Sequence, residues 1–425
     1  MTDLSNASAL SFTPAVGDAA FTAKQRSLLT VAHELGETKF APRAHEWDET
    51  ATFPFANYDD LRAAGFLALC VPEADGGLGA DYATYCVVAA EVGRFCGATA
   101  LTLNMHICST MWIGALIDPI AMSDAERGEH TRRRGLHFKR VVDDGKLYAQ
   151  PFSEGSAAAA GHAPFGTTAT RATKNGVEGW SIAGKKIWAS LSGAADYYGI
   201  LCTEAKGDDT PLDMRDTLYI AVPATSAGLV LSGEWNPMGM RGTVSRNLTF
   251  KDVFVPDDEQ LMPRGVYYQA AQTWPHMFFT LSPTYLGIAN AAYDFTVKYL
   301  RGEVAGEPPV KRRQYPTKQI AVAQMRIQLE AMRSMFWRAI HEAKPNPTKD
   351  ERLRLYAAHY TVMEGANDIA RLAIRTCGGQ SMMKHLPLER LYRDSRCGAL
   401  MLPWTAELCM DRIGREALYE VGEKD

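Results

Sequence analysis

The spacing of apolar residues changes twice along the chain, and the first stretch has a helical pattern. From about Phe21 to Ala41, apolar side chains recur every three or four residues, the spacing of one face of an α-helix (Leu28, Leu29, Val31, Ala32 and Leu35). Pro42 has no backbone N–H to donate, so it ends or kinks this helix. Similar patterns predict helices around 58–64, 82–94 and over parts of 101–147. We therefore expect an N-terminal helical domain over residues 21–146, preceded by a flexible leader over residues 1–20.

Short alternating segments mark the second stretch, from about Leu147 to Val255. They are rich in β-branched residues and are separated by glycine-rich turns, a combination that is typical of strands. Strands are predicted at 167–173, 179–183, 197–204, 217–222, 228–232 and 247–254. The sequence therefore predicts a middle β domain over residues 147–262.

Helical periodicity returns from about Gly265. Long helices are predicted at 282–301, 317–343, 348–377 and 404–420, and residues 302–309 between the first two are rich in helix breakers. These helices form a C-terminal helical domain over residues 263–425. The whole chain is therefore expected to have a mainly helical α+β fold.

Composition and charge narrow the classes of function. The chain has 425 residues with a net charge of −4, which argues against a nucleic-acid surface because phosphate binding needs a concentrated basic patch. No apolar run is long enough for a membrane span. The 8 cysteines have irregular spacings and form no C-x-x-C pair, which favours reduced thiols over a metal site. We expect a cytoplasmic protein.

Two segments far apart in the sequence carry the motifs of one known family. Residues 65–79 read G-F-L-A-L-C-V-P-E-A-D-G-G-L-G, and residues 390–396 read R-L-Y-R-D-S-R. In this order, with the β stretch between them, they closely resemble the acyl-CoA dehydrogenase family, over roughly residues 22–420. The resemblance implies an N-terminal helical domain, a middle β-barrel domain and a C-terminal four-helix bundle, assembled as a homotetramer or a dimer.

The same resemblance implies that FAD is the cofactor. Residues 184–196 read G-K-K-I-W-A-S-L-S-G-A-A-D and match the family segment beside the flavin ring, which is a flat apolar plate with polar edges. Trp188 and Ser190 are two residues apart on a predicted strand and should share one face. Trp188 is expected to pack near the ring and Ser190 to bind its polar edge. Further FAD contacts are implied for Phe152, Ser153, Gly378, Gly379, Thr405 and Glu407.

The catalytic base of the family is missing at both of its known positions. Many members place a glutamate where this chain has Pro403, and others place one where it has Met277. Neither side chain accepts a proton, whereas α,β-dehydrogenation of a thioester needs a carboxylate with a raised pKa. The candidate replacements are His276, Glu154 and His106. Residues 157–161, A-A-A-A-G, and the aromatic run 274–279 also replace family segments that grip coenzyme A.

Three functions fit these departures. The first is dehydrogenation of an acyl-CoA with a non-standard base, and the resemblance then implies electron-transferring flavoprotein as partner. The second is a monooxygenase of the same fold, which receives reduced flavin from a reductase, needs no carboxylate base and works in a dry pocket. The third is a non-catalytic FAD-binding partner subunit. We identify an FAD-dependent oxidoreductase that resembles acyl-CoA dehydrogenases and leave its reaction open at this point.

Overall fold

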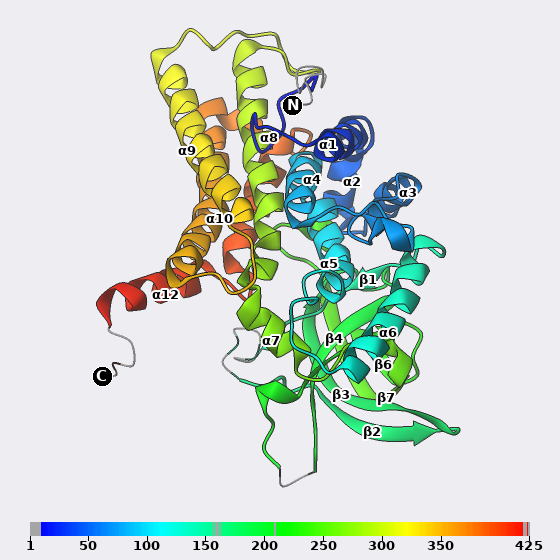
Figure 1. Cartoon of the computed structure of the whole chain (residues 1–425). Helices are drawn as coiled ribbons and strands as arrows, with labels where there is room; N and C mark the ends of the chain where they lie inside the picture. Colours follow the sequence, from blue (N-terminus) through cyan, green and yellow to red (C-terminus); the bar gives the residue numbers. More distant parts are fainter. Residues whose placement is uncertain are drawn as a thin grey trace.

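Most helices pack at one end of the molecule and the sheet lies at the other, as Figure 1 shows. The computed structural model describes residues 10–155, 158, 161, 163–207, 210–419 and 423. Along the chain, a group of helices is followed by the sheet and then by a second group of helices. This order confirms the mainly helical α+β fold that the sequence predicts.

The N-terminal helices continue where the sequence predicts a break. A π-helical turn over Gly36–Phe40 joins α1 (Ala23–Leu35) to α2 (Ala41–Thr50). In this π-helical turn the N–H of Ala41 donates to the Gly36 carbonyl, five residues back, and the helical path continues through Pro42 in the first turn of α2. The domain also contains α3 (Phe55–Ala63), α4 (Tyr82–Phe95), α5 (Gly97–Ile113) and α6 (Asp124–Val142).

The described part of the expected flexible leader is fixed to the protein. Ala15 and Val16 are buried, and the N–H of Ala15 donates to the Glu91 carboxylate on α4 at 2.7 Å. Arg333 and Trp337 donate side-chain hydrogen bonds to the carbonyls of Ala15 and Val16 at 3.1 and 2.9 Å. Residues 10–20 are therefore not loosely attached, while residues 1–9 lie outside the described residues.

The middle of the chain forms one 8-stranded sheet in the order β6-β7-β3-β2-β4-β5-β8, with β1 paired to β4. β6 and β8 are the two ends of this path. The predicted strands all coincide with strands of the sheet, and the two that the sequence missed, β1 and β8, are too short to show an alternating pattern. The strands are β1 (Tyr148–Ala149), β2 (Thr168–Lys174), β3 (Val177–Ala189), β4 (Tyr197–Glu204), β5 (Thr217–Pro223), β6 (Leu229–Ser232), β7 (Arg246–Pro256) and β8 (Gln260–Met262).

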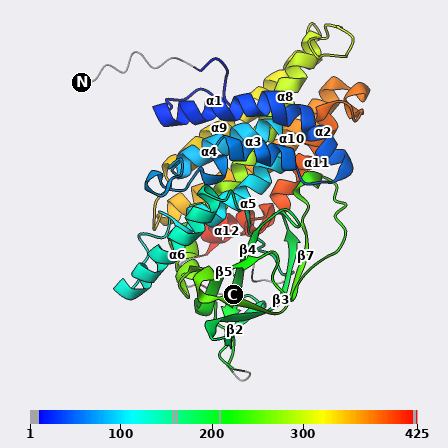
Figure 2. The same ribbon diagram turned by 90° about the vertical axis from the view of Figure 1, so that its right-hand side faces the viewer.

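The C-terminal helices form a bundle around α10. Helix α10 packs against α8, α9, α11 and α12, and Figure 2 shows the N-terminal helices lying along one side of this group. The helices are α7 (Val266–Thr273), α8 (Ser282–Arg301), α9 (Pro316–His341), α10 (Lys349–Cys377), α11 (Pro387–Cys397) and α12 (Ala406–Leu418). Glycines bring α8 close to α4, because a Cβ at Gly287 would lie 2.2 Å from the Ala90 carbonyl oxygen.

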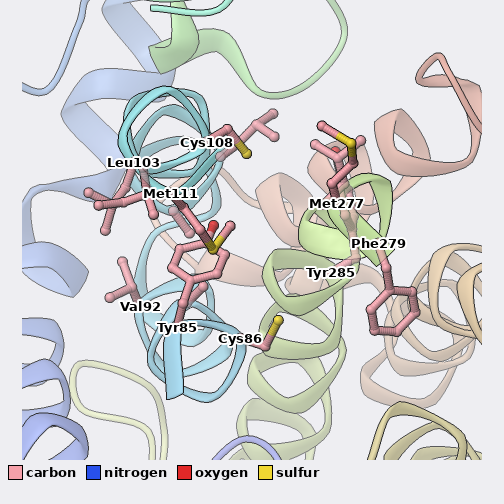
Figure 3. Packing of buried hydrophobic residues seen from close by; sticks show 14 of the residues in the cluster. Tyr85, Cys86, Val92, Leu103, Cys108, Met111, Met277, Phe279 and Tyr285 are labelled. Atoms are coloured by element: carbon pink, nitrogen blue, oxygen red, sulfur yellow. The ribbon is translucent and has the colours of Figure 1, made fainter. Parts of the chain in front are cut away.

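Buried side chains join the first domain to the bundle. Figure 3 shows Tyr85 and Cys86 on α4, Cys108 on α5, and Met277 just before α8, all within one core cluster. The Tyr85 hydroxyl donates to the Asn104 side chain at 2.6 Å, which satisfies a buried polar group inside this cluster. The core therefore extends from α4 and α5 of the first domain to Met277, just before α8.

The remaining sequence expectations concern membranes, metals and cysteines. Within the described residues, no helix is long and apolar enough to cross a bilayer, and no group of acidic, histidine or cysteine side chains is placed to hold a metal ion. The cysteines are free thiols, and most of them are buried.

Candidate flavin site

A cavity of about 330 Å³, here called the flavin cavity, lies where the three domains meet. One wall comes from α5, another from the start of the sheet domain and the end of β3, and a third from the residues before α8 and after α11. The four expected ring contacts Phe152, Ser153, Trp188 and Ser190 all line it. The other lining residues are mostly apolar or carry hydroxyl, thiol or amide groups, and include Leu101, Asn104, Cys108, Trp112, Gln150, Met240, Thr243, Ser245, Met277, Phe278, Cys397, Met401 and Pro403.

Trp188 and Ser190 reach this cavity by a different route from the predicted one. Strand β3 ends at Ala189, and its register with β7 shifts between Lys186 and Ala189. Trp188 has a positive φ of 53°, so the regular alternation of strand side chains is broken at this residue. Its side chain is 64% exposed and offers a large uncovered aromatic surface. A bulge, not strand alternation, brings the two side chains together.

Polar groups cluster on the sheet side of the cavity. The hydroxyls of Ser190 and Ser245 lie 2.8 Å apart, and Ser245 is in turn 2.8 Å from the Thr243 hydroxyl. Gln150 also lines the cavity, and its buried amide nitrogen has no hydrogen-bond partner among the described residues. Buried donors normally have a partner. An apolar wall with an aromatic face and unfilled polar groups at one edge fits an isoalloxazine ring.

The described residues that line the cavity offer no group that takes up a proton at neutral pH. Among the described residues that line it, none carries a carboxylate, imidazole, ammonium or guanidinium. Met277 and Pro403, at the two family base positions, both line it. Burial raises the pKa of the thiols of Cys108 and Cys397 to about 12, so both stay protonated. Of the segment 157–161, residues 157, 159 and 160 lie outside the described residues.

His106 is fixed in the interior behind the cavity wall. Its Nε2 donates to the carbonyl of Leu67 at 2.8 Å, and its Nδ1 accepts from the backbone N–H of Tyr148 at 3.0 Å. Burial lowers its pKa to about 4, so the ring is neutral. Both nitrogens are therefore occupied, and His106 is not part of the cavity lining. Its position joins α5 to the first strand of the sheet domain.

Glu154 belongs to a buried ion pair. Its carboxylate lies 2.6 Å from Nζ of Lys186 and accepts the backbone N–H groups of Gly166 and Thr167 at 2.7 and 3.0 Å. Burial alone would raise the pKa of Glu154, but the charge and hydrogen bond of Lys186 outweigh burial and hold the pKa below its usual value. Glu154 also lies outside the cavity lining, although its neighbour Ser153 belongs to it.

His276 is buried beside the cavity without entering it. The ring is 1% exposed, and neither nitrogen has a hydrogen-bond partner among the residues that the structure describes. Burial lowers its pKa to about 4. Tyr82 packs edge-on against the ring at 6.3 Å and donates to the His276 carbonyl at 2.9 Å. The following residues, Met277 and Phe278, line the flavin cavity instead.

The remaining predicted FAD contacts lie away from the ring cavity. Gly378 has a φ of 85° and ends α10, and a Cβ added to it or to Gly379 would meet nothing within 4 Å in this chain. Thr405 is the N-cap of α12, as its helix-opening position predicts, and its hydroxyl accepts from the N–H of Leu408 at 3.3 Å. Glu407 is exposed in the first turn of the same helix.

Helix α11 carries the R-D-x-R motif and fixes the cavity wall. Asp394 accepts the backbone N–H of Met240, a lining residue, at 2.5 Å. Burial raises the pKa of Asp394 to about 6. Arg393 binds Asp48 on α2 at 2.5 Å and Glu389 on its own helix at 2.7 Å. The motif therefore ties α2, the sheet domain and the bundle together around the cavity.

The helices, sheet and bundle meet at an apolar cavity with polar groups at one edge, the arrangement expected of a flavoprotein oxidoreductase. The chain belongs to the acyl-CoA dehydrogenase family: models of the family's N-terminal, middle and C-terminal domains match residues 22–116, 154–253 and 265–418. It is 27% identical over 373 residues to the human short-chain specific acyl-CoA dehydrogenase, covering 87% of this chain and 84% of that protein. It is 25% identical over 381 residues to the probable acyl-CoA dehydrogenase YngJ of Bacillus subtilis, covering 88% and 93%.

Solved structures with this fold include both dehydrogenases and oxygenases. KijD3 in complex with FMN and a dTDP-linked amino-keto sugar superposes with a TM-score of 0.79 at 23% identity, covering 97% of this chain and 98% of that chain. Butyryl-CoA dehydrogenase from Megasphaera elsdenii gives 0.75 at 22% identity, covering 95% and 100%. The dibenzothiophene monooxygenase TdsC from Paenibacillus sp. A11-2 gives 0.75 at 21% identity, covering 92% and 97%. At these identities the likeness establishes the fold.

Proposed function

We propose that this chain is a reduced-flavin-dependent monooxygenase. The observation that carries the proposal is the flavin cavity itself, in which no described lining residue carries a carboxylate or an imidazole. Removal of the α-proton of a thioester needs such a group within hydrogen-bond reach of the substrate. Oxygen transfer from a reduced flavin needs a closed apolar chamber instead, and apolar side chains stand at both base positions, Met277 and Pro403.

Each lining residue has a role in this proposal. Trp188 covers one face of the isoalloxazine ring, while Ser190 and Gln150 donate hydrogen bonds at its polar edge. These residues would hold a reduced flavin, which would supply the electrons for oxygen activation, with one oxygen atom going to the substrate and the other leaving as water. Phe152 and Phe278 keep water away from the reacting atoms. A matched pair of variants tests the binding step. Ser190→Ala should weaken flavin binding about fivefold. Ser192→Ala should leave the Kd unchanged, because the Ser192 hydroxyl donates to the carbonyl of Ala189 at the end of β3.

The second candidate is dehydrogenation of an acyl-CoA, which the similarity to the human short-chain enzyme favours. It requires that His276, Glu154 or His106 act as base from outside the cavity lining. The electron acceptor would then be electron-transferring flavoprotein. This reaction and the oxygenase reaction differ in what reduces the flavin: the substrate itself in the first, and a separate reductase in the second.

Cofactor form and assembly are further parts of the proposal. The expected cofactor is FAD, whose adenine half would contact Gly378, Gly379, Thr405 and Glu407. FMN should be tested as well, because FAD and FMN contain the same isoalloxazine ring. A homotetramer or dimer is supported by the exposed apolar residues Ile320 and Ile327, which are 59% and 71% exposed on α9. A cytoplasmic location and a flavin reductase as partner complete the proposal.

The test combines oxygen incorporation with an anaerobic titration. The purified protein is supplied with NADH, a flavin reductase, FMN or FAD, ¹⁸O₂ and a panel of indole, naphthalene and organosulfur compounds. We expect ¹⁸O in one product and no change of flavin absorbance when acyl-CoAs are titrated without oxygen. Bleaching by an acyl-CoA at a 1:1 ratio would overturn the proposal and establish a dehydrogenase. Flavin binding with neither result would point to a non-catalytic subunit.

A further inference from the structure

A second cavity of about 270 Å³ adjoins the flavin cavity. Three residues, Phe152, Phe278 and Pro403, line both spaces. The outer cavity, as we call the second one, is also lined by α7 and by parts of α10 and α12. It is the space that a substrate would cross to reach the flavin cavity from this side.

A set of aromatic side chains, here called the aromatic partition, stands between the two cavities. Phe278 contacts Trp112 at 6.2 Å, Phe152 at 6.3 Å and Trp404 at 5.6 Å, each edge to face. Tyr267 packs beside Trp112 at 5.9 Å, and its buried hydroxyl has no hydrogen-bond partner among the described residues. Edge-to-face and offset geometries are those that aromatic ligands also adopt. The partition therefore suits a planar apolar group.

Among the described residues that line the outer cavity, the charged ones are two arginines, Arg352 and Arg412. Arg352 on α10 donates to the carbonyls of Gln272 and Pro347 at 2.9 and 3.2 Å. Arg412 on α12 lies over the ring of Tyr356 at 5.0 Å. Neither arginine forms an ion pair with a carboxylate in the part of the chain that the structure describes. This distinguishes them from most arginines here, such as Arg354, which pairs with Glu342.

Tyr356 connects the two arginines to the interior, since Arg412 lies over its ring. Arg352 and Tyr356 are four residues apart on α10 and therefore neighbours on one helix face. Tyr356 contacts Trp404 at 4.8 Å, and Trp404 contacts Phe278 of the partition. A continuous path thus runs from Arg352 and Arg412, here called the arginine pair, past Tyr356 to the flavin cavity. Guanidinium groups bind carboxylate and phosphate oxygens through paired N–H donors.

We infer that the arginine pair binds an anionic group of the substrate, while the substrate's aromatic or apolar part lies on the aromatic partition and its far end enters the flavin cavity. The substrate class is therefore a compact aromatic acid. This inference rests on the proposed function for the place where the reaction occurs, but the binding site itself stands on the outer cavity. Arg352 and Arg412 are positioning residues, because they hold the substrate at a distance from the reacting atoms.

Calorimetry with two probes of equal shape tests the inference directly. The full-length protein is titrated with 1-naphthoate and with 1-naphthamide, which differ in charge but share the same aromatic surface. We expect 1-naphthoate to bind about tenfold more tightly, because a charged hydrogen bond to guanidinium is stronger than a neutral one. Arg352→Gln and Arg412→Gln should each weaken 1-naphthoate binding about five- to tenfold and leave 1-naphthamide binding unchanged. 1-Naphthyl phosphate, run in parallel, distinguishes a carboxylate site from a phosphate site.

Arg415→Gln is the matched control for Arg412→Gln. Both arginines are on α12, but Arg415 lies over Tyr419 and does not line the outer cavity. This variant should bind 1-naphthoate like the unchanged protein. Equal affinities for the two probes, unchanged 1-naphthoate binding in both arginine variants, or no measurable binding of either anion would each overturn the inference. Circular dichroism and the melting temperature show whether each variant is folded. Charge-dependent binding without any oxygen incorporation would leave this inference standing and reject the proposed function.

Discussion

Helix α11 and the turn at residues 401–405 are separated by one short 3-10 helix, Gly398–Leu400, and are held by different interactions. The helix is rich in charge: Arg393 binds Asp48, and Arg396 binds Glu364 at 2.6 Å. The turn has no charged side chain. Its centre, Trp404, is 2% exposed among aromatic rings, and its carbonyl accepts a hydrogen bond from His359 at 3.0 Å.

The charged residues of α11 support the fold, whereas the uncharged residues 401–405 line the cavities where a reaction would occur. Charged groups on α11 join three parts of the chain, so their loss would disturb the whole fold. The turn contacts the two cavities, α8 and α10 through uncharged groups: Met401 accepts from the Tyr285 hydroxyl on α8 at 3.3 Å, and Trp404 packs on Tyr356 of α10 at 4.8 Å. A change in its residues should therefore cost less stability. A chain can therefore keep the family architecture while Pro403 stands at a position where the resemblance places a glutamate base. The following predictions test this separation, from the largest expected effect to the smallest.

Removing Arg393 should have the largest effect. Arg393→Ala leaves Asp48, whose side chain is 5% exposed, charged and without its partner. We expect the free energy of unfolding to fall by about 3–5 kcal/mol, as is usual when one member of a buried ion pair is lost. Urea denaturation followed by circular dichroism measures this loss. Arg371→Ala, which removes an exposed pair with Asp368 at 3.5 Å, should cost less than about 0.5 kcal/mol; similar losses in both variants would contradict the prediction.

Glu154 should behave as a structural residue and not as a base. Glu154→Gln leaves Lys186, which is fully buried, without a counter-charge. The expected loss is about 3 kcal/mol, and replacing both residues by Gln and Met should recover part of it. The melting temperature and the turnover of the folded fraction are measured together. A large fall in turnover with an unchanged melting temperature would instead assign Glu154 to catalysis.

Asp394 should make the stability of the protein depend on pH. Its pKa is raised by burial from 3.8 to about 6, so the folded state holds a proton that the unfolded state has lost between these values. The contribution of Asp394 to stability is therefore greatest below pH 4 and falls by about 3 kcal/mol as the pH rises through 6. Asp394→Asn, which resembles the protonated form, should lose this slope. An identical pH dependence of unfolding in both proteins would refute the assignment.

The elements of the fold could be predicted because their signals are local. Helices such as 282–301 and strands such as 197–204 follow from apolar spacing and turn residues, and they match α8 and β4. The π-helical turn before Pro42 could not be predicted, because nothing in Gly36–Phe40 departs from an ordinary helical pattern. The burial of Ala15 and Val16 was also hidden, since it depends on Arg333 and Trp337 more than three hundred residues away.

Residues of the candidate site could be predicted where they lie in a family motif. They could not be predicted where tertiary packing determines which side chains face the cavity. The motif grouped Trp188 and Ser190 in one candidate site, and both line the same cavity, although a bulge and not strand alternation brings them together. Gln150 was missed, because its unpaired amide is visible only once the cavity exists. His276 and Glu154 were reasonable candidates by their place in the sequence. Whether a side chain faces a cavity or the core depends on tertiary contacts, such as Lys186 for Glu154, that sequence spacing does not contain.

The smallest expected effect concerns how the uncharged turn is held. The Nε2–H of His359 donates to the Trp404 carbonyl, so its Nδ1 accepts from the Ser282 hydroxyl at 2.9 Å. Burial lowers the pKa of His359 to about 4, which keeps the ring neutral and this pattern fixed. Ser282→Ala removes one neutral hydrogen bond and should cost about 1 kcal/mol in urea denaturation. The control is Ser334→Ala, which should cost almost nothing. The Ser334 hydroxyl is exposed on α9 and donates to the backbone carbonyl of Glu330. A loss above about 3 kcal/mol for Ser282→Ala would mean that the turn supports the scaffold as strongly as α11 does.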